Sequence, residues 1–485
     1  MKRFLFVALF MLSLPALFGQ SRSEALREYQ ALRRQAYADY VSSYRKAYVD
    51  FMRKRWEAFQ PGEPFAEPKR REPETPTVKS PDDNTVQTPA KIPSEVREEK
   101  PQSKPAPRPY EQKDSGKQSA AGQPATAGKP FKFTFYGTEC SATLTSSNKF
   151  KLSSTQESGV ASAWDRISKG SYDKAAAECR ATARTMNLND WGFYQLTRTL
   201  SNAFCGAGTN EAVVLQSFLM SEAGYMVRLA RTDSKLLLLA AVEDKVYARP
   251  YLQIDGKMFY VFDTSINASS YYICNFKVDG ERAMSMSMPT LPRFAEKPAK
   301  RAVRNAPKAG IETSVAVNAN TMDFLTDYPA CEWQKYASAP LSEQTKKALY
   351  PALRKAVEGK SERDAAQTLL SYIYEGFPYM VDDKQFGRER TLFAEEMYYY
   401  PYSDCEDRAI LFVRLVQDLM GLKTVLLHYP DHVAAAVRFK GDVSGDYVAV
   451  GKDKYVVCDP TYIGAGVGMS MPDFKNVRAT VIKLD

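Results

Sequence analysis

The sequence predicts an α+β protein made of two tandem copies of one unit, in which helices precede antiparallel strands. Three observations lead to this prediction. Apolar residues recur with helical spacing in some segments and fill short β-rich runs in others. Similar segments return in the same order about 195 to 197 residues later. Each copy places its helices before its strands, an order typical of folds in which helices cover one face of a sheet.

Composition fits soluble globular domains. The chain has 485 residues, of which 44% are hydrophobic and 25% are charged, so it is long enough for two or three domains. Residues 1–130 carry 23 Lys and Arg against 16 Asp and Glu, which accounts for most of the net charge of +9. The small basic excess elsewhere argues against a nucleic-acid-binding domain. His428 and His432 are the only histidines, which argues against a multi-histidine zinc centre.

The N-terminus has the features of an export signal. Lys2 and Arg3 precede an apolar run from Phe4 to Leu17, and small and polar residues follow. The run is too short to span a bilayer as a helix. We therefore expect residues 1–20 to be a cleaved signal peptide and the mature protein to be extracytoplasmic, either periplasmic or secreted.

Residues 21–60 predict one amphipathic basic helix. Ser21 and Glu24 fit a capping box, and apolar residues from Leu26 to Met52 recur every three or four positions. Arginines and lysines occupy the opposite face. We expect this helix to pack on the protein's own body or on a second copy. Contact with an anionic cell-envelope surface is the alternative.

Residues 61–130 predict a linker. They hold 14 of the 28 prolines and almost no large apolar residues. Such a segment buries too little surface to offset its ordering entropy, so we expect it to be disordered and partly extended. The two copies are then expected to form domains at 131–295 and 296–485.

Each copy contains the same succession of segments. A helix comes first, a second helix follows, and three β-rich runs complete the copy. In the first copy these are residues 191–204, 208–224, 226–229, 237–242 and 259–264, and in the second copy 364–374, 405–421, 424–428, 432–437 and 455–461.

Seven cysteines are an odd set for an oxidising compartment, so at least one is expected to remain unpaired. We expect most of them to be buried free thiols, because cysteine packs as a small hydrophobe. They are Cys140, Cys179, Cys205, Cys274, Cys331, Cys405 and Cys458.

One cysteine of the second copy stands where a nucleophile is favoured. Cys405 follows Ser403 and Asp404, either of which can cap the helix expected to begin there. The first turn of a helix stabilises a thiolate through its dipole and its unpaired N–H groups. His432 and Asp459, both in β-rich segments, supply a base and a group that orients the base. The sequence thus predicts a catalytic triad.

These residues and their neighbours resemble the transglutaminase-like superfamily. The resemblance lies in Ser-Asp-Cys-Glu-Asp-Arg-Ala around Cys405, in the small and apolar residues after His432, and in Cys-Asp-Pro-Thr-Tyr around Asp459. It implies a papain-like cysteine nucleophile fold with Cys405 as nucleophile, His432 as base and Asp459 as orienting acid. It also implies an oxyanion bound by the backbone N–H of Cys405, with Gln385 and Tyr400 as candidates for the second donor.

By this resemblance the chain is expected to be a secreted acyl-transfer enzyme that attacks amide bonds of a protein or peptide through a thioester intermediate. A peptidase or amidase is favoured over a cross-linking transglutaminase. We expect no cofactor and no metal, because neither copy has an acidic loop of EF-hand spacing. The alternative is a catalytically inactive transglutaminase-like binding or scaffold protein of the cell envelope.

The first copy lacks the residues of the triad. Gly208 and Leu237 align with the cysteine and the histidine, and only Asp263 matches the aspartate. Without a nucleophile or a base, this copy cannot carry out the chemistry. We therefore expect a degenerate domain that supports the second copy or binds substrate.

Overall fold

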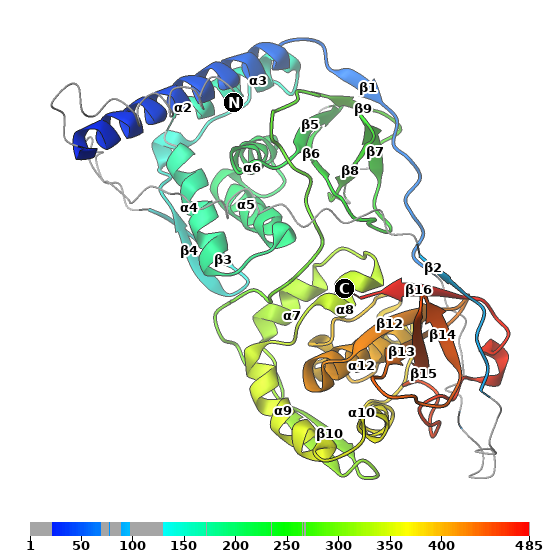
Figure 1. Ribbon diagram of the computed structural model, residues 1–485. Coiled ribbons are helices and arrows are strands. Elements are labelled where there is room, and N and C mark those ends of the chain that lie inside the picture. Colours follow the sequence, from blue (N-terminus) through cyan, green and yellow to red (C-terminus); the bar gives the residue numbers. More distant parts are fainter. Residues whose placement is uncertain are drawn as a thin grey trace.

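The computed structural model describes residues 22–68, 77, 89–97, 130–170, 172–233, 235–263, 265 and 268–484. The expected signal peptide, residues 1–20, lies outside them. The described chain forms two lobes, one above the other in Figure 1. Within these described ranges, no helix is both long and apolar enough to cross a membrane.

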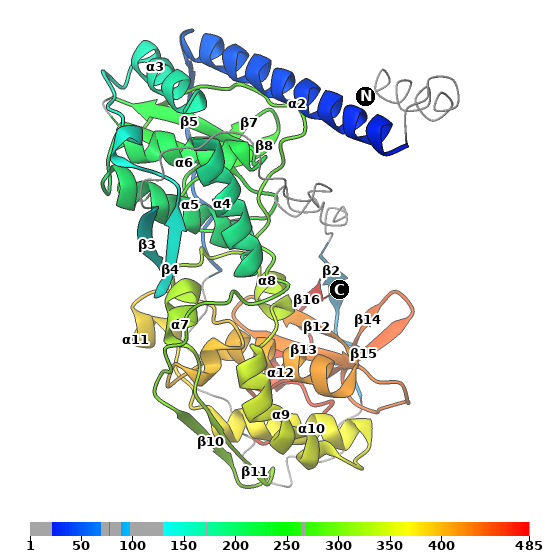
Figure 2. The ribbon, with the colours of Figure 1, turned by 90° about the vertical axis from the view of Figure 1, so that its left-hand side faces the viewer.

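The first lobe packs helices against a six-stranded sheet (Figures 1 and 2). Side-chain caps start two of its helices, since Asn189 accepts the Gly192 N–H and Thr209 accepts the Ala212 N–H. Its elements are β3 (Phe131–Phe135), β4 (Thr138–Ala142), α3 (Glu157–Ser168), α4 (Tyr172–Thr185), α5 (Asp190–Cys205), α6 (Asn210–Glu222), β5 (Val227–Thr232), β6 (Lys235–Ala241), β7 (Tyr251–Ile254), β8 (Lys257–Val261) and β9 (Tyr271–Ile273).

The second lobe repeats this plan with a central helix, α12, lying on its sheet (Figure 1). The helix ends at Gly421, whose left-handed backbone (φ 64°) an L side chain adopts only with strain. The elements are β10 (Ala302–Ala306), β11 (Ile311–Val315), α7 (Ala319–Thr326), α8 (Trp333–Ser338), α9 (Glu343–Val357), α10 (Glu362–Gly376), α11 (Asp382–Phe386), α12 (Cys405–Met420), β12 (Lys423–His428), β13 (Val433–Arg438), β14 (Tyr447–Val450), β15 (Asp453–Cys458) and β16 (Ala479–Lys483).

The two sheets share one strand order. With β1 (Glu57–Phe59) at its edge, the first runs β1-β9-β5-β6-β8-β7. With β2 (Ser94–Val96) at the corresponding edge, the second runs β2-β16-β12-β13-β15-β14. All neighbours are antiparallel except β2 and β16, which are parallel. The α+β prediction is therefore confirmed, and the internal repeat found in the sequence corresponds to a repeated sheet topology.

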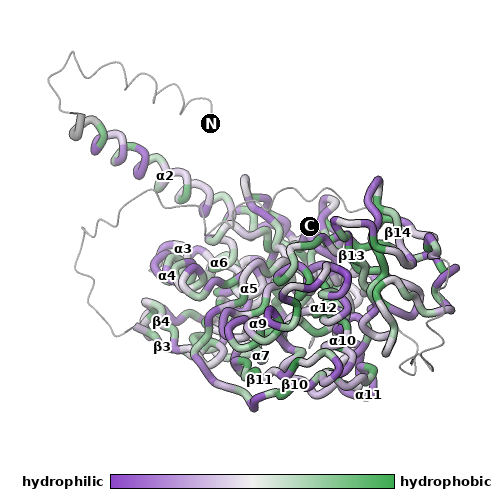
Figure 3. Tube along the Cα trace, turned by 60° about the horizontal axis from the view of Figure 1, so that its bottom comes forward, coloured by the Kyte–Doolittle hydropathy of each residue, from purple (hydrophilic) through white to green (hydrophobic). Residues whose placement is uncertain are grey.

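The predicted N-terminal helix, α2 (Arg22–Met52), ends eight residues earlier than expected. Its last turns pack on the first lobe, where Tyr48, Val49 and Met52 are buried. The earlier turns extend past the lobe (Figures 2 and 3) and expose Leu26 and Tyr37, among others. The helix thus docks on the protein's own body, one of the two expected arrangements.

The expectation of a wholly disordered linker fails for the parts that the structure describes. Residues Glu57–Phe59, which fall in the predicted helix and not in the predicted linker, form β1 at the edge of the first sheet. Ser94–Val96, inside the predicted linker, form β2 at the edge of the second sheet. Low apolar content does not prevent ordering here, because a sheet edge supplies backbone hydrogen bonds that an isolated segment lacks.

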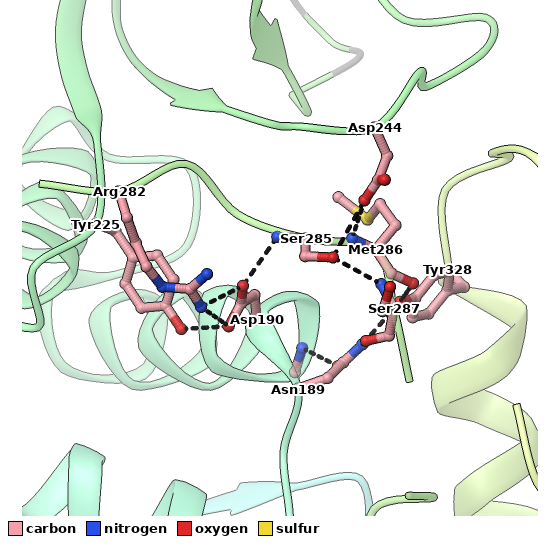
Figure 4. A network of polar contacts seen from close by, with 10 residues as sticks. Asn189, Asp190, Tyr225, Asp244, Arg282, Ser285, Met286, Ser287 and Tyr328 are labelled. Atoms are coloured by element: carbon pink, nitrogen blue, oxygen red, sulfur yellow. Dashed lines mark hydrogen bonds and ion pairs between the residues drawn. The ribbon is translucent and has the colours of Figure 1, made fainter. Parts of the chain in front are cut away.

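A buried polar network joins the lobes (Figure 4). Tyr328, which follows α7, donates to the Met286 carbonyl at 2.7 Å and accepts from Asn189 at 2.7 Å. Lys335 of α8 forms an ion pair with Asp244 at 2.8 Å, with side-chain exposures of 5% and 11%. These contacts connect elements of the second lobe to loops of the first.

All seven cysteines lie in described residues, and each is a free thiol. Six are buried and Cys205 is half-buried. Burial raises the pKa of the Cys205 thiol to about 12. This outcome agrees with the expectation that most of them are buried free thiols.

Candidate active site

Cys405 is the first residue of α12, and its side chain is buried, with 1% exposure. Asp404 is the N-cap and forms a capping box with Asp407, which lies three residues further on. The Asp407 carboxylate accepts the Asp404 N–H at 3.3 Å. The predicted helix start is therefore correct, and the sulfur sits at the positive end of the helix dipole.

His432 and Asp459 meet as predicted. His432 closes the turn between β12 and β13, where its carbonyl accepts the Tyr429 N–H at 2.8 Å. Asp459 directly follows β15. Its Oδ2 lies 2.8 Å from His432 Nε2, while its Oδ1 accepts the Thr461 N–H at 2.9 Å. The carboxylate is thus fixed by the backbone of the following turn and holds the imidazole.

The imidazole is placed between a carboxylate and a thiol. Burial of His432 acts to lower its pKa, but the charge and hydrogen bond of Asp459 and the hydrogen bond with Cys405 outweigh burial and raise the pKa above its usual value. Because Nε2 faces Asp459, Nδ1 is the nitrogen available to the sulfur. Asp459, and to a smaller extent the nearby thiol, therefore favour the protonated form of the imidazole.

A buried glutamate also contacts the sulfur. The Cys405 thiol donates to Glu406 Oε2 at 3.6 Å, and Glu406 has no exposed surface. The Thr391 hydroxyl lies 3.5 Å from Glu406 Oε1. Sequence reasoning did not single out Glu406, although an acidic residue directly after a candidate nucleophile is a visible signal. In this arrangement the thiol therefore donates its proton to the glutamate carboxylate.

Arg408, one turn into α12, ties the parts of the site together. It is buried and donates to the carbonyls of Pro460 and Phe377. Its guanidinium lies 5.1 Å from the centroid of the Tyr379 ring. Burial lowers the pKa of Arg408 to about 10. The residue joins the helix that carries Cys405 to the turn that follows Asp459, a role that the sequence did not reveal.

Aromatic rings cover the imidazole. Phe474 stacks on His432 with centroids 5.1 Å apart and planes 11° apart, and it also stacks on Tyr429 at 4.7 Å. His432 itself is only 3% exposed, whereas Phe474 is partly exposed. Phe474 therefore forms an outer wall of the site.

The two candidate oxyanion donors are engaged elsewhere. The Gln385 amide donates to the Tyr402 carbonyl at 3.3 Å and accepts the Tyr402 N–H at 3.1 Å. The Tyr400 hydroxyl pairs with Thr326 at 3.2 Å. Neither side chain is brought to the sulfur, because the backbone of Tyr402 holds Gln385 and the hydroxyl of Thr326 holds Tyr400. The backbone N–H of Cys405 remains the candidate donor.

A cavity of about 200 Å³ reaches Thr391, but neither Cys405, His432 nor Asp459 lines it. Its lining includes Thr391, which contacts Glu406, and Trp333. His428 also lines it and packs edge-on against Trp333 at 4.8 Å between ring centroids. His428 thus packs against an aromatic ring, as a structural histidine does, and only His432 pairs with Asp459.

An acidic cluster flanks the helix start. Carboxylate oxygens of Asp382, Asp404 and Asp407 lie within 4.8 Å of one another, and all three side chains are buried. Such oxygens suit a hard cation. However, Asp382 accepts the Arg390 N–H and Asp407 accepts the Leu392 N–H, each at 2.7 Å. One carboxylate oxygen each of Asp382 and Asp407 therefore already accepts a backbone N–H.

Comparison with known proteins assigns no family to this chain. No family model matches the sequence, and neither a curated protein nor a solved structure matches it. The functional argument therefore depends on the geometry of the site.

Proposed function

We propose that the chain is a cysteine-nucleophile acyl-transfer enzyme with two transglutaminase-like lobes, of which the second is catalytic and the first is degenerate. Its substrate is an amide of a protein or peptide, and hydrolysis is favoured over cross-linking. The proposal agrees with the α+β architecture and with the repeated strand order. No cofactor takes part in the proposed chemistry.

One observation carries this proposal. His432 Nε2 lies 2.8 Å from Asp459 Oδ2, and the nearby Cys405 thiol is among the groups that raise the pKa of the same imidazole. These three side chains come from a helix start, a turn and a strand end that are distant in the sequence. Buried structural thiols have no need of an imidazole that is itself oriented by a carboxylate.

The proposed reaction has two halves. The Cys405 thiolate attacks the amide carbonyl, the C–N bond breaks, and the His432 imidazolium gives its proton to the departing amine. The acyl group is then held as a thioester. In the second half, His432 takes a proton from water, the resulting hydroxide attacks the thioester carbonyl, and the carboxylic acid leaves as the C–S bond breaks. An amine in place of water would give a new amide.

Electrostatics at the helix start support the tetrahedral steps. The backbone N–H of Cys405 is in the first turn of α12, where N–H groups have no acceptor within the helix. A negative oxygen developing next to the sulfur would lie at the positive end of the dipole. Asp459 would stabilise the imidazolium in the first half.

The test is detection of the acyl-enzyme. The mature chain is incubated with a pool of denatured protein fragments, with and without a fluorescent primary amine, and Cys405 is analysed by mass spectrometry. We expect a thioester on Cys405, fragments with new carboxyl ends, and less amine incorporation than hydrolysis. Cys405→Ala is the control. Absence of both products and of a Cys405 adduct, from a sample in which Cys405 is labelled by iodoacetamide, would contradict the proposal.

A second candidate is the inactive binding or scaffold protein. Its supporting observation is the burial of Cys405, which is 1% exposed. This candidate predicts that Cys405 resists alkylation in all forms of the folded protein and that ligands bind without turnover.

We also propose that the mature protein acts outside the cytoplasm, after removal of residues 1–20. The charged start and the short apolar run of the sequence support this. Sequencing the N-terminus of the protein recovered from its native cells tests it. A retained Met1 would contradict export.

A further inference from the structure

Residues 89–97 dock on the second lobe as an added strand. On one side they pair in parallel with β16, where the Ala479 N–H donates to the Pro93 carbonyl at 2.9 Å and the Arg97 N–H to the Val481 carbonyl at 3.0 Å. The contact therefore consists largely of backbone hydrogen bonds, as in peptide recognition by strand addition.

One side chain anchors this strand. Ile92 is fully buried within the outer apolar cluster of the second sheet. Its N–H donates to the Tyr447 carbonyl at 2.9 Å, and the Tyr447 N–H donates to the Ala90 carbonyl at 3.0 Å. By contrast, Glu95 is 58% exposed and contacts only the exposed Arg478 among the ion pairs described. Backbone pairing plus one aliphatic anchor thus defines the docked segment.

The docked segment is connected to the wall of the active site through Asp446. The Asp446 Oδ1 accepts the Ala90 N–H at 2.9 Å. Its Oδ2 accepts the Ser470 N–H at 3.1 Å and lies 3.4 Å from Lys475 Nζ. One buried carboxylate therefore holds both the docked segment and the stretch from Ser470 to Lys475.

That stretch carries Phe474, the ring that stacks on His432. A second point of contact lies nearby, since Thr77 forms a bridge with Ile463 in the same connection between β15 and β16. The N-terminal segment and the covering connection are thus joined at two places. The covered imidazole is 3% exposed.

We propose that residues 89–97 are a releasable regulatory segment that keeps the proposed active site closed. Docked, they hold Asp446, and Asp446 holds Phe474 over His432. Release of residues 89–97 from the β16 edge would withdraw the Ala90 N–H from Asp446 and let Phe474 leave the imidazole. The inference rests on the proposed function only in naming the site that becomes accessible.

The experiment compares Ile92→Glu with the matched control Glu95→Gln in the full mature chain. Alkylation of Cys405 by iodoacetamide is followed by peptide mass spectrometry, with the buried Cys458 as internal reference. Amide exchange of residues 470–476 is measured in parallel. We expect Ile92→Glu to speed Cys405 alkylation by about tenfold or more and to speed exchange at 470–476, with Cys458 and the control variant unchanged. An unchanged Cys405 rate, with 94–97 shown by exchange to be released, would overturn the proposal.

If both Cys405 and Cys458 react faster in Ile92→Glu, an experiment with an added peptide tests the proposal. A synthetic peptide of residues 89–97 is added to this variant, and the same peptide with Glu for Ile serves as control. The native peptide should return Cys405 alkylation to the wild-type rate, and the control peptide should not. Equal effects of the two peptides would overturn the proposal.

The alkylation readout separates this inference from the proposed function. Rapid Cys405 alkylation on release, without cleavage or transfer of any amide, would leave the regulatory segment standing and contradict the enzyme. Equal amide turnover by wild type and Ile92→Glu would support the enzyme and contradict the regulatory segment.

Discussion

The two lobes share a sheet and differ in chemistry. The corresponding helices begin at Asn210 in the first lobe and Cys405 in the second, each directly after a capping residue. In the first sheet Val261 pairs with Leu239, and in the second sheet the corresponding Val457 pairs with Ala436. Four residues before these partners lie Lys235 and His432, which therefore occupy equivalent positions. The fold thus holds a helix start beside a strand start in both lobes, and only the second places a thiol and an imidazole there.

The aspartate is common to both lobes. Asp263 Oδ1 accepts the Ser265 N–H at 3.0 Å, just as Asp459 Oδ1 accepts the Thr461 N–H at 2.9 Å. Capping of the following turn is therefore the shared role of this carboxylate. Its second oxygen orients a base only where His432 is within reach. The aspartate of the proposed triad therefore has a structural role in both lobes and orients a base only in the second.

The largest effect is expected from His432→Ala. Removing the base from the second lobe makes it resemble the first, so acyl transfer and the reactivity of Cys405 at pH 6 should fall by about 10²–10⁴. Rates of alkylation and amide turnover measure this. A variant with unchanged alkylation at pH 6 would show that the imidazole does not activate the sulfur.

Asn210→Cys plants a thiol at the helix start of the first lobe. Without an imidazole beside it, this thiol has only the helix start to stabilise its thiolate, so its alkylation should slow by roughly 20- to 100-fold between pH 8 and pH 6. Cys405 should lose much less over the same range. Parallel profiles for both thiols would remove the chemical distinction between the lobes.

Lys335→Met breaks the buried ion pair that joins the lobes. It leaves the Asp244 carboxylate uncompensated at 11% exposure, which should cost about 3 kcal/mol of unfolding free energy. Calorimetry should show the lobes separating into two transitions. Lys346→Met removes a partly exposed pair with Glu343 and should cost less than about 1 kcal/mol. Equal losses in the two variants would contradict a structural role for the interlobe pair.

Asp459→Asn and Asp263→Asn compare the shared aspartate. Because the folded-state pKa of His432 is raised, its charge stabilises the fold fully below the unfolded value near 6.5, and this contribution is lost as pH rises through the folded value. Asp459→Asn should therefore cost about 1–3 kcal/mol near pH 6 and less at high pH. Denaturant titrations at several pH values measure this. The first-lobe variant should lack this imidazole-linked change, and matching pH profiles would contradict the assignment.

The sequence was sufficient to place Cys405 at a helix start and to pair His432 with Asp459, because each lies at the end of a regular element, and element ends follow capping and turn residues. Cys405 follows its cap, and Asp459 precedes a Pro-Thr turn. The sequence repeat aligned Gly208 with Cys405 and Leu237 with His432. The structure aligns Asn210 and Lys235 with them instead, two residues later in the first case and two residues earlier in the second. The turns joining the strands differ in length between the lobes, and a fixed offset cannot register them.

What the sequence could not supply depends on contacts between distant segments. Gln385 and Tyr400 have suitable donors, but Tyr402 engages the first and the distant Thr326 engages the second. Ordering of Ser94–Val96 was missed because its partner strand lies nearly 400 residues later. Glu406 and Phe474 acquire their roles only when the helix, the turn and the final connection come together.

The outermost strands β1 and β2 have a practical consequence for protein production. Each lobe receives one border strand from the region ahead of residue 100, so neither folding unit is encoded by its own uninterrupted stretch of chain. A shortened protein starting at residue 130 would leave β9 and β16 with unsatisfied amides along bare borders, which invites aggregation. Soluble material should therefore require the residues before 100, supplied either in the same chain or as a co-expressed fragment.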